Sequence, residues 1–135
     1  MATSTKTDYA AVWREAKAAG EAAARACTPT PMTVFDAHLD GTPVKGGQTY
    51  FVPSGLCGFA TIIIKPATSG FARWLKANER TYKHYYGGLS YFVHAECTNG
   101  TTFSQSVDIK EAWARAAVKV LRDHGISCGM ETRLD

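Results

Sequence analysis

The sequence predicts an α+β fold: a single domain with a mixed sheet of about four to five strands, three helices and the element order α-β-β-β-α-β-α-β. Apolar residues recur at helical spacing near both ends of the chain, whereas the middle is rich in β-branched and aromatic runs bounded by Gly and Pro. The 135 residues, 45% of them hydrophobic and 20% charged, suit one globular domain rather than a disordered or fibrous chain.

The first helix is expected over residues 8–27, after a polar segment, residues 1–7, that we expect to be disordered. Thr7 or Asp8 can cap this helix by accepting hydrogen bonds from its first backbone N–H groups. Proline in the segment 28–31 ends it. One face is bulky at its start and small at its end, and it carries Tyr9, Val12, Trp13, Ala16, Gly20, Ala23 and Cys27.

Strands are expected over residues 32–38, 48–52 and 59–65. An Asp-Gly pair at 40–41 is a hairpin-turn signal between the first two. The third strand contains three consecutive isoleucines, 62–64, without alternation, which predicts a central strand covered on both faces. This aliphatic run is far shorter than the roughly 20 apolar residues of a membrane-spanning helix, so no membrane contact is predicted.

A short helix that ends at about Glu79 is expected next, with Thr68 or Ser69 as its N-cap. A glycine pair, 87–88, then precedes a strand over residues 89–96. The two crossovers of the later chain each run strand–helix–strand, and this favours parallel pairing.

The last helix is expected to begin at Asp108, because Asp108 and Glu111 have the spacing of a capping box. Gly125 suits the left-handed position that follows a helix, with Ile126 placed for a Schellman ending. A strand over residues 127–133 follows.

Positive charge is concentrated in the segment 65–86, where five Lys or Arg residues occur with one Glu, although the net charge of the chain is only +3. Arg73, Lys76 and Arg80 have the spacing of one helical face, and Lys83 follows. Three tyrosines lie beside them: Tyr82, Tyr85 and Tyr86. Cations neutralise phosphates, and aromatic rings stack on unpaired bases. We therefore predict a binding module that contacts nucleic acid or an acidic protein here; a solvated helix face with tyrosines in the core is the alternative.

A second hypothesis is a small cysteine-dependent enzyme in which Cys57 acts with His38 or His94. Cys57 lies in a loop between two glycines, and a nucleophilic thiolate needs a neighbouring base. Asp36 could orient a histidine. In the usual arrangement a strand precedes the nucleophile, whereas here a strand follows it. A small residue in a turn is therefore the alternative, and a protein without catalytic activity is favoured.

Potential metal ligands occur in pairs on predicted strands, Asp36 with His38 and His94 with Glu96, and Cys97 follows the second pair. Their spacing matches no compact zinc module. Neither a metal nor another cofactor is predicted. The four cysteines lack C-x-x-C spacing and are expected to be reduced thiols.

A third hypothesis is a protein–protein adaptor that uses the small-residue face of the first helix. No basic segment followed by an apolar stretch opens the chain, so a cytosolic protein is expected. The sequence leaves the oligomeric state open.

Several segments, 55–60 (GLCGFA), 64–66 (IKP), 71–76 (FARWLK), 111–116 (EAWARA) and 132–135 (TRLD), resemble small uncharacterised proteins of bacteria and their phages. The resemblance covers roughly residues 50–135. It implies a bacterial cytoplasm or an infected cell as the location. It implies no activity, because no catalytic motif comes with it.

Overall fold

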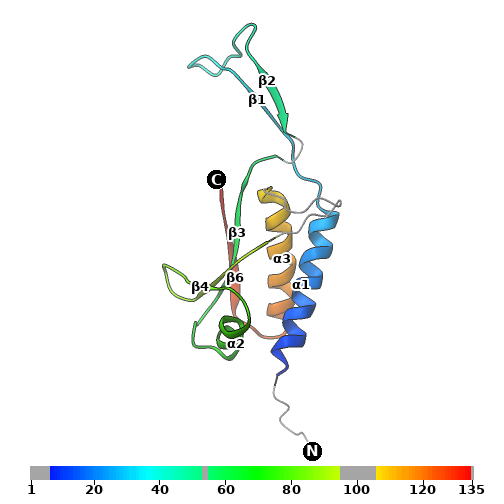
Figure 1. Ribbon diagram of the computed structural model, residues 1–135, viewed down its shortest axis with the longest axis vertical. Coiled ribbons are helices and arrows are strands. Elements are labelled where there is room, and N and C mark those ends of the chain that lie inside the picture. The colour runs from blue at the N-terminus through cyan, green and yellow to red at the C-terminus, as the bar shows by residue number, and fades with distance from the viewer. Residues whose placement is uncertain (1–6, 53–54, 95–105, 135) are drawn as a thin grey trace, which may run out of the picture.

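A computed structural model describes residues 7–52, 55–94 and 106–134 (Figure 1). The predicted α+β class with three helices is confirmed. In chain order the elements are α1 (Tyr9–Ala26), β1 (Met32–Phe35), β2 (Thr49–Val52), β3 (Gly58–Ile64), α2 (Gly70–Asn78), β4 (Tyr82–Lys83), β5 (Leu89–Phe92), α3 (Val107–Asp123) and β6 (Cys128–Leu134). The predicted disordered residues 1–6 and the end of the predicted strand 89–96 lie outside the described residues.

The main sheet has the strand order β4-β5-β3-β6, and every neighbouring pair is antiparallel. The predicted parallel pairing is therefore wrong, although the strands that each helix joins do run in the same direction. The helix α2 joins β3 to β4, which run in the same direction with β5 between them. In the same way α3 joins β5 to β6, and β3 lies between them. This is the connectivity of the split β-α-β, ferredoxin-like arrangement.

The helices cover one face of this sheet, where α1 and α3 lie side by side (Figure 1). Along β3 the side chains of Ala60, Ile62 and Ile64 are buried in the core beneath the helices. The alternate residues point to the other face, where Phe59 is 39% exposed. The expectation that this strand is covered on both faces is therefore wrong: β3 is central in the sheet, but all of the helical cover is on one side.

The end of α1 that carries small residues packs against α3 of the same chain. A Cβ atom on Gly20 would lie 2.5 Å from the indole ring of Trp113 in α3. Ala16 and Ala24 on the same face are fully buried, and Ala24 takes the place predicted for Ala23. Much of the face proposed for an adaptor is thus packed against α3 of the same chain, whereas Ala23 and Cys27 are half-buried.

Of the four cap motifs predicted at helix ends, three are confirmed. The Asp8 carboxylate accepts from the N–H of Ala11 at 3.1 Å, and the Ser69 hydroxyl accepts from Ala72 at 3.3 Å. At the end of α3 the predicted Schellman motif is confirmed by two backbone bonds, Ile126 N–H to Leu121 and Gly125 N–H to Arg122, with Gly125 at φ +81°.

The predicted capping box of α3 is wrong. The N-cap is Ser106, and Asp108 lies inside the first turn. Its carboxylate instead accepts from the backbone N–H of Thr30 at 2.9 Å. A contact 78 residues away along the chain therefore takes the carboxylate that local spacing assigned to the helix.

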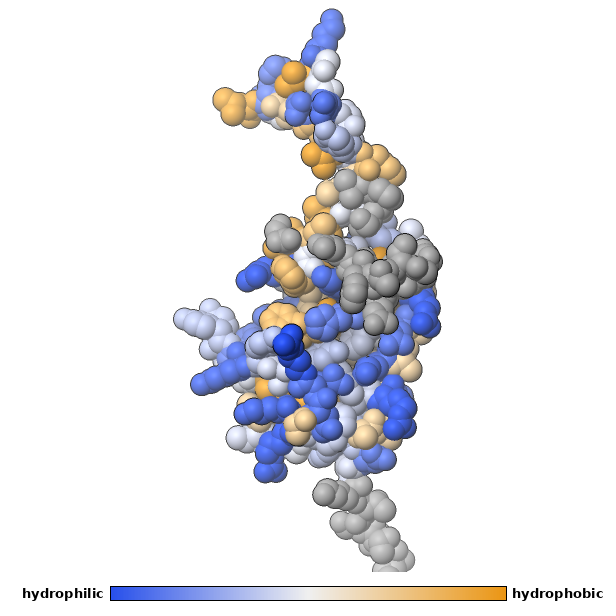
Figure 2. Space-filling model, viewed as in Figure 1, coloured by the Kyte–Doolittle hydropathy of each residue, from blue (hydrophilic) through white to orange (hydrophobic). Residues whose placement is uncertain are grey.

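Strands β1 and β2 form a separate two-stranded sheet, and residues 32–52 extend away from the rest of the molecule as an arm (Figure 1). The predicted turn at 40–41 is present, with Gly41 N–H donating to His38. Figure 2 shows apolar side chains along the arm. The large exposed ones are Val34, Phe35, Leu39, Tyr50 and Phe51.

No helix in the described part of the chain is long and apolar enough to cross a membrane.

Candidate functional site

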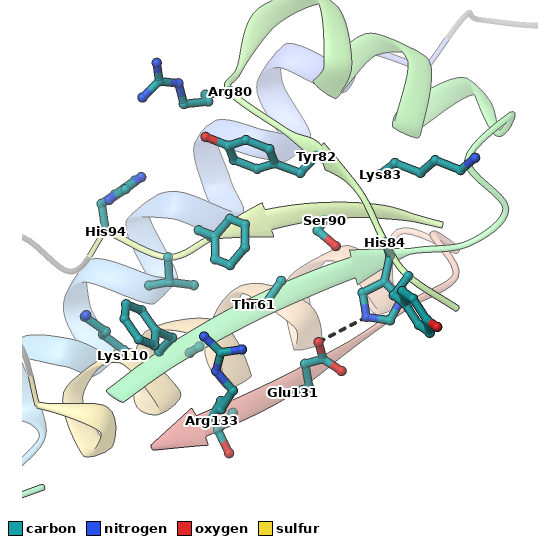
Figure 3. A pocket seen from close by; sticks show the side chains of 16 residues that line it. Thr61, Arg80, Tyr82, Lys83, His84, Ser90, His94, Lys110, Glu131 and Arg133 are labelled. Atoms are coloured by element: carbon teal, nitrogen blue, oxygen red, sulfur yellow. Dashed lines mark hydrogen bonds and ion pairs between the residues drawn. The ribbon is translucent and has the colours of Figure 1, made fainter. Parts of the chain in front are cut away.

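The face of the main sheet that carries no helix is hollowed into a groove of about 530 Å³ (Figure 3). Its walls come from all four strands and from Lys110 on α3. Thr61 of β3 and Ser90 of β5, on the two inner strands, face the groove and are only 6% and 3% exposed. These two hydroxyl groups therefore form the floor, and larger side chains rise around them.

Strand register explains which side chains share this face. Residues directly opposite one another on neighbouring strands point to the same side of a sheet. Thr61 lies opposite both Phe92 on β5 and Glu131 on β6. Ser90 lies opposite Tyr82 on β4.

Aromatic rings form part of the walls. Tyr82 and Phe92 meet edge to face with their ring centroids 5.3 Å apart, and they are 48% and 39% exposed. Phe59 on β3 also lines the groove, with Lys110 Nζ 5.1 Å and Arg133 Cζ 5.7 Å from the centroid of its ring. Lys110 is held in place because its ammonium donates to the Gly58 carbonyl at 2.9 Å. The groove thus exposes aromatic surface beside cations, one of which, Lys110, is anchored.

The charge of the groove is strongly one-sided. In the described part of the chain, four Lys and Arg residues line it, and Glu131 is the only carboxylate that does so. Lys83 and Arg80 belong to β4 and the segment before it, Lys110 to α3 and Arg133 to β6. Lys83 is opposite the buried Leu89, so its side chain points away from the groove, and the other three cations face it (Figure 3). The groove therefore attracts anions.

A hydrogen bond between a histidine and a carboxylate closes one end of the groove. His84 Nε2 lies 3.0 Å from Glu131 Oε1, and the histidine side chain is only 11% exposed (Figure 3). The backbone N–H of Tyr86 donates to His84 Nδ1 at 3.3 Å. Because Nδ1 accepts, the proton of the neutral ring is on Nε2, which donates to the Glu131 carboxylate.

The structure divides the predicted basic surface into two parts. Arg80 and Lys83 line the groove with Tyr82 and Tyr85, and Tyr86 contacts Tyr85 at 4.9 Å between ring centroids. By contrast, Arg73 and Lys76 are exposed on α2 and do not line the groove.

The predicted helical face that joins Arg73, Lys76 and Arg80 is wrong because α2 ends at Asn78. Glu79 is already extended, with φ −131° and ψ 162°, and its carboxylate accepts from the indole N–H of Trp13 at 3.2 Å. This long-range contact holds the chain in the direction of β4, which places Arg80 at the groove.

The aromatic and charged lining residues that were not predicted as site residues are Phe59, His84, Phe92, Lys110, Glu131 and Arg133. Phe59 and Thr61 share a face because side chains alternate along a strand, but the run 59–64 shows no alternation of polar and apolar residues that would reveal it. Likewise, no sequence signal connects Lys110 or Arg133 with the groove, because they reach it only through the sheet order.

The residues of the cysteine hypothesis lie in different parts of the fold. Cys57 is exposed and pairs by a β-bridge with Ser106, His94 lines the groove, and His38 is on the arm. No hydrogen bond links Cys57 to either histidine within the described residues. Burial raises the pKa of the Cys128 thiol.

Burial, followed by the carboxylates of Asp108 and Glu111, also raises the pKa of the Cys27 thiol. Both shifts oppose formation of a thiolate. Over the described ranges, no three His, Cys, Asp or Glu side chains are grouped as metal ligands would be. Two of the potential metal ligands, Glu96 and Cys97, lie outside those ranges.

Comparisons of the chain with protein-family models, with curated proteins and with solved structures give no match. The geometry of the groove is therefore the basis for a functional assignment.

Proposed function

We propose that the helix-free face of the sheet binds single-stranded nucleic acid. The observation that supports this most directly is the groove itself, in which partly exposed rings of three strands lie among the side chains of Arg80, Lys110 and Arg133. Sheets of this connectivity can present aromatic rings on which unpaired bases stack, and basic side chains around them neutralise phosphates.

The arrangement suits a single strand better than a duplex. Tyr82 and Phe92 lie within the groove beside the buried floor residues Thr61 and Ser90, so a base must leave its stack to reach them. In a duplex, the ring faces of the bases are covered by neighbouring bases. A flat basic surface without accessible rings would suit a duplex as well as a single strand.

The test is fluorescence anisotropy with labelled single-stranded RNA, single-stranded DNA and duplex DNA at several salt concentrations. We expect single strands to bind more tightly than the duplex. If Arg80, Lys110 and Arg133 each neutralise one phosphate, the logarithm of the binding constant should fall with a slope of roughly −2 against the logarithm of salt concentration.

A matched pair of variants distinguishes the groove from general positive charge. Arg80→Ala with Arg133→Ala removes two cations of the groove, whereas Arg73→Ala with Lys76→Ala removes two exposed cations of α2. We expect the first variant to lose most of the affinity and the second to lose little. Equal losses would point to nonspecific charge attraction. Absence of binding at low salt would rule the proposal out and favour an acidic protein partner.

A further inference from the structure

We infer that Glu131 makes the groove select bases that carry an exocyclic amino group, so that cytosine is preferred to uracil. This inference rests on the proposed function and deepens it. Cations that contact phosphates bind every sequence alike, so any base preference must come from groups that face the base edge. Among the residues that the structure describes, Glu131 is the only carboxylate that lines the groove, and its side chain is 55% exposed.

The position of Glu131 suits a reader of base edges. Thr61 on β3 lies between Phe92 on β5 and Glu131 on β6, and all three are paired in register. Phe92 and Glu131 are thus two strand spacings apart, about 10 Å. A base stacked on Phe92 would extend over the Thr61 floor and turn its hydrogen-bonding edge toward the carboxylate.

The carboxylate is also held in place. One oxygen, Oε1, accepts from His84 Nε2 at 3.0 Å, and the Tyr86 N–H fixes the tautomer of that histidine. The other oxygen, Oε2, has no hydrogen-bond partner among the residues that the structure describes. It is therefore an acceptor available to a ligand.

An ionised carboxylate accepts hydrogen bonds and donates none. It pairs favourably with the N4 amino group of cytosine and repels the O4 carbonyl of uracil, which is otherwise nearly the same shape. The positive rim and the negative Glu131 thus have separate tasks: the rim contacts the backbone, and the carboxylate selects the base.

The test compares oligo(rC) and oligo(rU) of about twelve nucleotides by anisotropy near neutral pH, with the deoxy versions measured in parallel. We expect the wild-type protein to bind the cytosine oligomer about fivefold or more tightly. The Glu131→Gln variant should bind both within about twofold, because an amide supplies a donor as well as an acceptor.

Glu15→Gln is the matched control. Glu15 on α1 is 60% exposed and also accepts from a histidine, since its Oε2 lies 2.8 Å from His124 Nε2, but it does not line the groove. This variant removes the same charge and should keep the cytosine preference.

The outcomes separate the inference from the proposed function. Equal binding of both oligomers by the wild type, or an unchanged preference in Glu131→Gln, overturns the inference while single-strand binding stands. If neither oligomer binds in either sugar form, the proposed function fails and the inference fails with it.

Discussion

His84 and Glu131 join the two edge strands of the sheet across its helix-free face. They are 47 residues apart in the chain, and their side chains meet at 3.0 Å above the two inner strands. His84 directly follows β4 and Glu131 belongs to β6, so the pair limits the groove at one end. The remaining walls are rings and cations, which leaves the other end suited to a polyanion.

We predict that Phe92→Ala weakens single-strand binding by about 1–3 kcal/mol, because stacking of one base on an aromatic ring contributes about that much. Anisotropy titrations at one fixed salt concentration measure the change. The slope against salt should stay the same, since no phosphate contact is removed.

Tyr50→Ala serves as the control for the loss of an exposed ring, because Tyr50 is 57% exposed on the arm and does not line the groove. If Tyr50→Ala weakens binding as much as Phe92→Ala does, the arm and not the groove is in contact with the ligand.

We predict that Gly20→Ala destabilises the fold by about 1–3 kcal/mol, the usual range for an added group in a well-packed core. The new methyl group would lie 2.5 Å from the Trp113 ring, so α1 and α3 must separate or the ring must move. Urea unfolding monitored by circular dichroism measures the effect.

Gly129→Ala is the matched control, since a Cβ there meets nothing closer than Arg122 at 3.7 Å. Its stability should change little. A Gly20→Ala variant as stable as the wild type would mean that α1 and α3 leave room for a methyl group at residue 20, contrary to the 2.5 Å contact.

Features governed by neighbouring residues could be predicted from the sequence. The caps at Asp8 and Ser69 and the turn at Gly125 each depend on groups within a few residues. Helical spacing likewise predicted the buried start of α1, where Val12 and Trp13 are 6% and 3% exposed.

Features governed by distant contacts could not be predicted. The strand β4 has only two residues and is defined by its pairing with β5, so sequence periodicity cannot detect it. Without β4, the helix α2 was expected to join β3 directly to the strand after it, β5, and these two strands were therefore expected to be parallel. The same reason explains Asp108, which has the spacing of a cap but bonds to Thr30 instead.

The candidate site was predicted in part. Arg80, Tyr82, Lys83 and Tyr85 are close together in the sequence, so charge and aromatic content identified them. Arg133 reaches the groove because β6 pairs with β3 in a register that sets it opposite Phe59. That relationship depends on sheet order, which one sequence does not determine.

We predict that the rest of the molecule folds without the arm. Met32 and Val52 are paired across β1 and β2, so their Cα atoms are about 5 Å apart and a short glycine linker can replace residues 33–51. The base of the arm is held separately, because Thr30 N–H donates to Asp108 and Gly55 lies directly against the Thr30 carbonyl.

Thermal unfolding of the shortened chain should remain cooperative, with a melting temperature within about 4 °C of the original, which corresponds to roughly 1 kcal/mol or less. A chain that loses its cooperative transition would show that the arm contributes to the core. Unchanged single-strand binding by the shortened chain would further locate the ligand on the sheet.

The last prediction concerns alkaline pH. Burial, followed by the carboxylates of Glu79 and Glu21, raises the pKa of Tyr91 to about 12. In the unfolded chain this phenol ionises near pH 10. The stabilising contribution is therefore complete below about pH 10 and is lost as the pH rises toward 12, because only the unfolded state releases the proton in that interval. The shift corresponds to at most about 2.7 kcal/mol.

We expect Tyr91→Phe, which cannot ionise, to lose less stability than the wild type between pH 10 and 12 in urea unfolding. Tyr50→Phe on the exposed arm should follow the wild-type curve. Parallel curves for wild type and Tyr91→Phe would mean that the Tyr91 hydroxyl is reached by solvent in the folded protein.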